Sequence, residues 1–178
     1  MKLEQWRVVM ALIPMMVYPL SGQQQGTASA APGSPLAISL STGTDQLKVD
    51  APIPVVVTLT NISNSPVRLR LLGLPEGSYR RLRWRFTLST TDGHEIPKTP
   101  FHRAISGEHR PGDPAIDVDP DFLNYTLKPG MSDHTTIDVK KLFDITQPGL
   151  YLFSVEMPEN ADSKIAIKSQ PLQLNVYP

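Results

Sequence analysis

The sequence predicts an all-β fold, and three observations support this prediction. Apolar and polar residues alternate with a period of two in many short segments, which is the pattern of strands with one buried face. The 18 prolines and 11 glycines recur too often to allow a long amphipathic helix. Turn-forming pairs such as Asp92-Gly93 separate the alternating segments.

The first half of the chain contains four predicted strands. Leu36–Ser41 and Pro54–Asn61 each place alternate aliphatic residues on one face. Val67–Leu72 alternates arginine with aliphatic residues, and Arg81–Thr90 alternates more regularly. The apolar side of this last strand consists of Leu82, Trp84, Phe86 and Leu88. We expect Trp84 to fill the centre of the core rather than to form a binding platform.

The second half contains five more predicted strands. Phe122–Leu127 ends at the turn Lys128-Pro129-Gly130. The others are His134–Val139, Tyr151–Met157, Lys164–Lys168 and Pro171–Tyr177. Since each strand has one apolar face, two sheets must pack these faces together to exclude water. The pattern therefore predicts an immunoglobulin-like antiparallel β-sandwich of about seven to nine strands.

The stretch around Pro148-Gly149 predicts a corner of this fold. Proline fixes φ and glycine admits a positive φ, so the pair is typical of a turn. Tyr151, Phe153 and Val155 then alternate inward. We expect the Tyr151 hydroxyl to bond back to nearby backbone, as tyrosines at such corners do.

The segment from Pro97 to Asp121 shows no periodicity and predicts a long loop. Loops of this length in compact domains are usually functional or mobile. The segment is therefore a candidate functional site.

The N-terminus predicts an export signal. Lys2 and Arg7 precede the apolar stretch Val8–Leu20, which is too short to span a bilayer, since a span needs about 20 apolar residues. We expect a signal peptide at 1–22, with cleavage as late as residue 30, then a flexible tether at 23–35. One β-sandwich domain at 36–178 follows, of about the size of an ordinary domain.

The sequence contains no cysteine. Small secreted animal domains usually carry disulfides, so an exported chain without cysteine favours a bacterial periplasmic or extracellular protein. The composition also excludes cysteine nucleophiles, thiolate zinc sites and iron-sulfur clusters. The formal net charge of zero predicts no attraction to nucleic acid.

Four motifs, VVVTLTNISNSPVRL, FTLSTTDGHEI, LKPG and QPGLYLFSV, together resemble secreted immunoglobulin-like domains of bacteria. More distantly they resemble the intracellular proteinase inhibitor type of bacilli. The resemblance covers Leu36 to Val155 and rests on turn and core positions. It implies the fold and, as an alternative function, proteinase inhibition. The loop at 97–121, which would then enter the protease cleft, has no counterpart in the resembled proteins. The export signal and the arginine-rich strand at Arg81 to Ser89 depart from the inhibitor pattern.

An arginine array is the strongest candidate binding feature. If the strands at 67–72 and 81–90 pair as a hairpin, their outward arginines share one sheet face. This predicted arginine face consists of Arg68, Arg70, Arg81, Arg83 and Arg85. Guanidinium groups suit carboxylates and phosphates, so an anionic glycan, a lipid head group or an acidic protein surface would fit there. The alternative is that acidic residues of the loop at 97–121 neutralise the same face.

The loop itself supplies further candidate contacts, namely His102, His109, Asp113, Asp117, Asp119 and Asp121. The alternating aspartates suggest a calcium site, but the glycine and the distal glutamate of an EF-hand loop are missing. The histidines show no metal-hydrolase spacing. The sequence also lacks a Gly-x-Ser-x-Gly elbow and a phosphate-binding glycine loop.

The sequence therefore predicts a non-enzymatic exported binding or structural module of the bacterial cell envelope, with no cofactor and no bound metal. Its expected partner is a protein or an anionic glycan. A secreted proteinase inhibitor or regulator that uses the loop at 97–121 is the alternative.

Overall fold

The computed structural model describes residues 28–30, 33–72, 84–108, 110–113, 122–158 and 166–178. Within these ranges the chain is mostly β, as predicted. The strands are β1 (Leu36–Ser41), β2 (Leu47–Lys48), β3 (Pro54–Asn61), β4 (Val67–Leu72), β5 (Arg85–Thr90), β6 (Phe122–Leu127), β7 (Ser132–Asp138), β8 (Gly149–Pro158), β9 (Ala166–Lys168) and β10 (Leu172–Tyr177). The helices are α1 (Pro100–Ile105) and α2 (Val139–Leu142).

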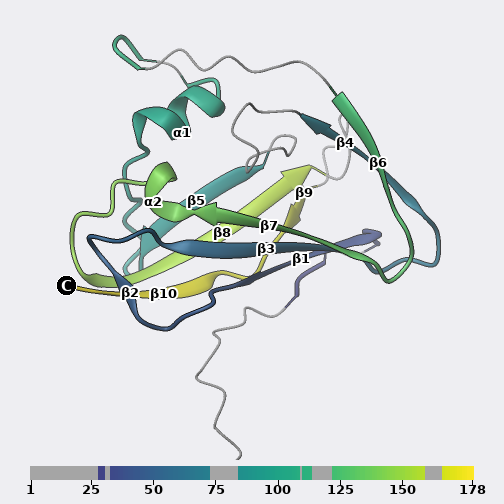
Figure 1. The fold of residues 1–178 in the computed structure, drawn as a ribbon, viewed down its shortest axis with the longest axis horizontal. Helices are drawn as coiled ribbons and strands as arrows, with labels where there is room; N and C mark the ends of the chain where they lie inside the picture. Colours follow the sequence, from purple (N-terminus) through teal and green to yellow (C-terminus); the bar gives the residue numbers. More distant parts are fainter. Residues whose placement is uncertain (1–27, 31–32, 73–83, 109, 114–121, 159–165) are drawn as a thin grey trace, which may run out of the picture.

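The described strands form three sheets, and most neighbouring strands are antiparallel. One sheet has the order β1-β3-β7. A second has the order β2-β10-β8-β5, with β9 also paired to β8 and with β2 parallel to β10. The third consists of β4 and β6, which lie to the right of the other two sheets in Figure 1. Figure 1 shows α1 and α2 together at the upper left.

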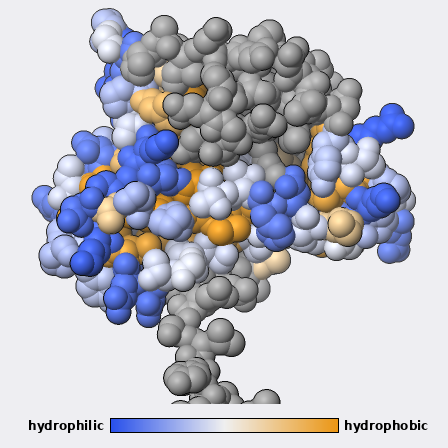
Figure 2. Space-filling model, in the orientation of Figure 1, coloured by the Kyte–Doolittle hydropathy of each residue, from blue (hydrophilic) through white to orange (hydrophobic). Residues whose placement is uncertain are grey.

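The first two sheets contribute to one hydrophobic core. Buried side chains of the first sheet include Ile38, Leu40, Val55, Val57, Leu59 and Ile137. Buried side chains of the second include Phe86, Leu88, Phe153, Val155, Leu174 and Val176. Trp84 is also buried, which confirms the prediction that it fills the core. Figure 2 shows hydrophilic residues over much of one outer face, with small hydrophobic areas between them.

Four strands have the predicted bounds, namely β1, β3, β4 and β6. In β1 and β3 the alternate aliphatic residues are the buried ones, so the sequence pattern is sufficient to locate these strands. The strand predicted at 81–90 begins at Arg85: Trp84 is described but does not belong to β5, and 81–83 lie outside the described residues. The two-residue strand β2 was not predicted, since a strand so short has no periodicity.

The predicted hairpin between the strands at 67–72 and 81–90 is wrong. β4 pairs with β6, with Leu69 opposite Tyr125, and β5 pairs with β8, with Phe86 opposite Val155. Neighbours in sequence usually pair, but here each strand finds a partner from later in the chain. The two arginine-bearing strands therefore belong to different sheets.

Turns explain the ends of several strands. Gly93 has a φ of 90° and donates its N–H to the Thr90 carbonyl at 3.0 Å, so the Asp92-Gly93 turn is confirmed. The expected corner at Pro148-Gly149 differs in detail: Gly149 is the first residue of β8 and has no positive φ. The Tyr151 hydroxyl donates to the Gln147 carbonyl at 2.7 Å, which confirms its predicted backbone bond.

The segment predicted as a long loop contains a helix. Thr99 is the N-cap of α1, its hydroxyl accepts from the His102 N–H at 3.1 Å, and Pro100 occupies the first turn. Both features favour the start of a helix. The side chains of His102 and Ala104 are buried, and Thr99 donates its N–H to the Leu142 carbonyl of α2 at 3.0 Å. Part of the segment is therefore anchored to the body of the fold.

The tether expected at 23–35 differs from the structure where residues are described. Ser29 pairs with Ile38 of β1 through two backbone hydrogen bonds of 3.1 and 3.0 Å. The Ser34 side chain is buried and accepts from the Leu36 N–H at 3.2 Å. The residues just before β1 therefore pack on that strand. The signal peptide predicted at 1–22 lies outside the described residues.

Candidate functional site

The structure does not bring the predicted arginine face together within the described residues. Arg68 is exposed on β4 and Arg85 is exposed on β5, and these strands lie in separate sheets. The side chain of Arg70, together with Arg81 and Arg83, lies outside the described residues.

Arg85 belongs to a small charge cluster on the outer face of the second sheet. Its Nη1 lies 3.9 Å from Oε1 of Glu156 on β8, and Lys168 of β9 places Nζ 3.0 Å from Oε2 of the same carboxylate. The Glu156 carboxylate thus forms ion pairs with both Arg85 and Lys168, and the Arg85 side chain remains 82% exposed. Among the described residues the partner of Arg85 is Glu156 of the neighbouring strand, and the loop acids Asp117, Asp119 and Asp121 lie outside these residues.

Asp113 holds the segment after α1 in place. Arg103 donates from Nε to Oδ2 of Asp113 at 2.9 Å and from Nη2 to Oδ1 at 2.5 Å, and its Nη1 donates to the Lys98 carbonyl at 2.7 Å. The Arg110 N–H adds a bond of 3.0 Å to Oδ2. The Arg103 hydrogen bond lowers the pKa of Asp113 to about 2 and raises the pKa of Arg103. Asp113 is therefore an ionised structural anchor.

Lys98 and Glu108 form a second ion pair in this segment. Their Nζ and Oε1 atoms are 2.6 Å apart, and this hydrogen bond lowers the pKa of the Glu108 carboxyl. Both side chains are partly exposed, at 35% and 52%. The pair joins the start of the segment to the residues after α1.

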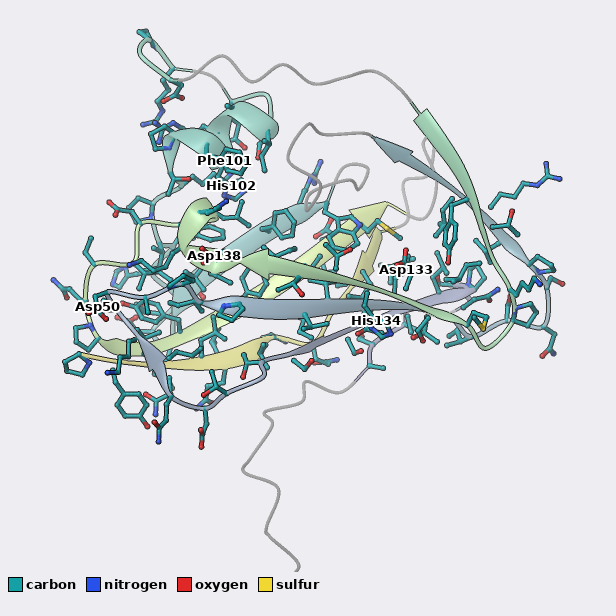
Figure 3. The ribbon with its side chains drawn as sticks, viewed as in Figure 1. Asp50, Phe101, His102, Asp133, His134 and Asp138 are labelled. Atoms are coloured by element: carbon teal, nitrogen blue, oxygen red, sulfur yellow. The ribbon has the colours of Figure 1, made fainter. Side chains whose placement is uncertain are left out.

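His102 is a buried residue and is not available to solvent. Only 2% of it is exposed, and its Nδ1 donates to the Leu142 carbonyl of α2 at 3.1 Å. Its ring lies edge-on to Phe143, with centroids 4.8 Å apart, and to Phe86 at 6.0 Å. Burial lowers its pKa to about 4, and Lys98 adds to this effect. Figure 3 shows His102 on the side of α1 that faces α2.

The other predicted loop contacts, His109, Asp117, Asp119 and Asp121, lie outside the described residues. The suggested calcium site falls on them as well. Within the described part of the chain, no group of three or more histidine and acidic side chains is placed to hold a metal ion.

A pocket of about 370 Å³ opens beside β5. Its residues come from β5, from the hairpin that follows it, from α1 and from the segment after α1. They are Phe86, Thr87, Leu88, Glu95, Ile96, Pro97, Lys98, Arg103, Glu108, Arg110 and Phe143. The lining combines aromatic and aliphatic residues with acidic and basic ones, a combination typical of binding sites.

Glu95 and Arg110 form no ion pair or side-chain hydrogen bond among the described residues, although the charge of Arg110 acts on the carboxylates of Glu108 and Asp113. The other three charges, on Lys98, Arg103 and Glu108, take part in the ion pairs above. A ligand would therefore meet the Glu95 carboxylate, which has no ion-pair partner among the described residues, and the Arg110 guanidinium close to Glu108 and Asp113.

Sequence reasoning missed this pocket. Its residues lie on several segments that only the fold brings together. One local signal was present in the sequence: Thr99-Pro100 is a pair typical of a helix start. It would have predicted a helix at α1 and, with it, an ordered position for the charged residues nearby.

Neither a protein-family model nor a curated protein matches the chain. Among solved structures, a β-glucosidase from Erythrobacter marinus has 9% identity and a TM-score of 0.37, over 81% of this chain and 16% of that one. β-Glucosidase from Listeria innocua, bound to laminaribiose as a D270A mutant, has 12% identity and a TM-score of 0.38, over 82% and 16%. This chain thus spans about 16% of their length. At such low TM-scores the likeness carries no argument about fold or activity.

Among the described residues, no helix is long and apolar enough to span a membrane.

Proposed function

We propose that this chain is an exported, non-enzymatic binding module of the bacterial cell envelope, built on an immunoglobulin-like sandwich. The shared core of the first two sheets and the hydroxyl bond of Tyr151 support this fold. The apolar stretch Val8–Leu20 with its preceding basic residues supports export. The observation that carries the function is the pocket beside β5.

The lining of the pocket favours binding. At about 370 Å³ it lies within the range of ligand pockets, about 300–1,000 Å³. Phe86, Ile96 and Phe143 supply apolar contact area, while Glu95 and Arg110 supply orientation and selectivity. The ion pairs of Lys98 and Arg103 fix the surrounding segment before a ligand arrives, which reduces the entropy lost on binding.

Two titratable groups near the pocket, His102 and Asp113, are engaged in structure. His102 is neutral at pH 7 because burial lowers its pKa, and its Nδ1 proton is bonded to backbone. Asp113 is ionised and bound by Arg103. A general acid or base needs a pKa near the working pH and access to substrate, and these two groups have neither. We therefore give His102 and Asp113 no catalytic role, and we propose binding as the function of the pocket.

The partner class is a protein or an anionic glycan of the envelope. The test compares the full chain with a double variant, Glu95→Gln with Arg110→Gln, in pull-downs from the native envelope and on an array of anionic glycans. The matched control removes an exposed acid and an exposed base elsewhere, Asp45→Asn with Lys128→Gln.

We expect the wild-type chain and the control to retain the same partner, and the double variant to lose it. A partner retained equally by the double variant contradicts the assignment of the pocket. If the wild-type chain retains nothing in either assay, the binding function itself is wrong.

The alternative, a secreted proteinase inhibitor, has less support from the described residues. The described part of the 97–121 segment contains α1, and the buried side chains of His102 and Ala104 hold this helix to the core. An inhibitory loop presents exposed backbone to a protease cleft, whereas the described part of this segment is anchored through α1. Protease inhibition that survives in the double variant would favour the alternative.

A further inference from the structure

The outer edge of β5 is only partly covered by the described chain. Near its C-terminal end, the Ile96 N–H donates to the Leu88 carbonyl at 2.9 Å and the Thr90 N–H donates to the His94 carbonyl at 2.9 Å. The chain then turns away at Pro97, whose segment pairs instead with Phe143 and Asp144. The earlier half of the edge has no neighbouring strand within the described ranges.

Backbone groups at this half of the edge point outward. In a strand the N–H and C=O of one residue point to the same side, and those of the next residue to the other. Since the Leu88 carbonyl points to the outer edge, the N–H and C=O of Phe86 point there too, whereas Thr87 pairs with Ser154 of β8. No hydrogen bond to the outward groups of Phe86 occurs among the described residues. Phe86 and Thr87 also line the pocket.

If another strand were added at this edge of β5, the side chains on its two faces would have different neighbours. The side chains of Phe86 and Leu88 point inward and are buried, and Ile96 and Phe143 line the same pocket. The side chains of Arg85 and Thr87 point outward. Arg85 shares the carboxylate of Glu156 with Lys168, so this outer position retains excess positive charge.

We infer that the partner of the proposed module is an extended peptide segment that adds as a strand to the edge of β5. It exchanges two backbone hydrogen bonds with Phe86, places an apolar side chain opposite Phe86 inside the pocket, and places an acidic side chain opposite Arg85. Strand addition is an established mode of peptide recognition, in which backbone bonds supply affinity and alternate side chains supply selectivity. This inference rests on the proposed function and names the partner of the same site.

The test uses short end-blocked peptides of threonine that contain one glutamate next to one leucine. Binding to the isotope-labelled full chain is followed by the amide NMR shifts of Phe86 and Leu88 and by hydrogen exchange of the Phe86 amide. We expect both shifts to change and the exchange of the Phe86 amide to slow.

N-methylation of the peptide tests the backbone pairing. A methyl group on the leucine nitrogen removes the donor opposite the Phe86 carbonyl and should weaken binding about tenfold. A methyl group on the glutamate nitrogen, which points away from β5, is the matched control and should leave most of the affinity. Equal affinity of the two methylated peptides would overturn the inference.

The charge preference is tested with a variant of Arg85. Replacing the peptide's glutamate by lysine should weaken binding to the wild-type chain about threefold, as expected for an exposed pair. Arg85→Gln should abolish this preference. Lys168→Gln removes the other cation of the same cluster, two strands from the open edge, and should retain the preference.

The outcomes separate this inference from the proposed function. If no peptide of this set binds while the envelope partner still depends on Glu95 and Arg110, strand addition is wrong and the binding module stands. If peptide binding shifts side-chain signals of the pocket but not the amides of Phe86 and Leu88, strand addition is again wrong. If both experiments show no binding, the proposed function fails as well.

Discussion

His102 and Asp113 have pKa values below their ordinary ones for different physical reasons. At His102 the cause is burial, which disfavours the imidazolium form. At Asp113 the cause is the Arg103 guanidinium, which favours the carboxylate. Both pKa shifts make the free energy of unfolding depend on pH, each over a different pH range.

We expect the protein to lose stability as the pH falls from 6.5 to about 4, because His102 is protonated in the unfolded chain throughout this window but not in the folded one. The loss should be on the order of 3 kcal/mol and complete near pH 4. Denaturant unfolding at several pH values measures it. His102→Phe should remove this slope, and His134→Gln, at an exposed histidine, should retain it. An unchanged slope in His102→Phe would contradict this origin.

Asp113→Asn should lower the melting temperature at pH 7, because it removes the charge that Arg103 binds with two hydrogen bonds. A depressed pKa stabilises the fold above the ordinary value of 3.8 and this contribution is lost as the pH falls through about 2. The difference from wild type should therefore be constant at neutral pH and vanish near pH 2. Glu108→Gln, at the more exposed Lys98 pair, should have a smaller effect. Equal effects would contradict the anchoring role of Asp113.

At the scale of the element, α1 is too short to be stable by itself. Six residues give barely more than one turn, so packing and capping must hold the helix. The packing comes from His102 and Ala104, and the cap comes from Thr99, whose hydroxyl also donates to the Lys141 carbonyl at 2.6 Å.

Thr99→Ala should destabilise the protein by about 1 kcal/mol, the usual cost of losing an N-cap. It removes the acceptor of the His102 N–H and the bond to Lys141. Thr99→Ala should also increase the amide hydrogen-exchange rates of α1 more than those of β8. Ser106→Ala, at the exposed C-terminal end of the same helix, is the control and should change little. Similar losses in the two variants would show that the cap at Thr99 has no special role.

At the scale of the whole molecule, the aromatic cluster joins the second sheet to α1 and α2. Phe153 is fully buried, its ring is nearly parallel to that of Phe86 at 6.2 Å, and it meets Phe143 edge-on at 6.4 Å. Phe86 and Phe143 in turn contact His102. The core and the pocket wall therefore depend on the same side chains.

Phe153→Ala should cost about 3–5 kcal/mol, because it leaves a cavity at the centre of this cluster. Tyr177→Ala, at a residue that is 45% exposed, should cost about 0.5 kcal/mol or less. Denaturant unfolding followed by fluorescence measures both. A small effect of Phe153→Ala would mean that the two sheets do not share one cooperative core.

The sequence predicted the strands well and their partners poorly. Period-two alternation located β1, β3, β4 and β6, because burial of one face is a local property of the pattern. It did not predict that β4 pairs with β6 or that β5 pairs with β8, because pairing depends on competition among distant strands.

The candidate site was predicted only in part. Asp113 and Arg85 do take part in charged contacts, but with Arg103 and Glu156 as partners. His102, expected as a loop contact, is buried, because a helix start at Thr99-Pro100 turns its ring to the core. The pocket requires the hairpin after β5 and α1 to meet, which no local pattern encodes.

The open half of β5 has a second consequence, for how copies of this protein behave at high concentration. An uncovered strand edge is a template on which another copy of the same strand can grow into an aggregate. Antiparallel pairing of two copies about Phe86 would bring both Arg85 side chains to one face, within about a Debye length of each other, so their charges repel. Arg85, which would favour an acidic peptide, thus also opposes self-association of the protein when no peptide is bound. Added salt should weaken this repulsion.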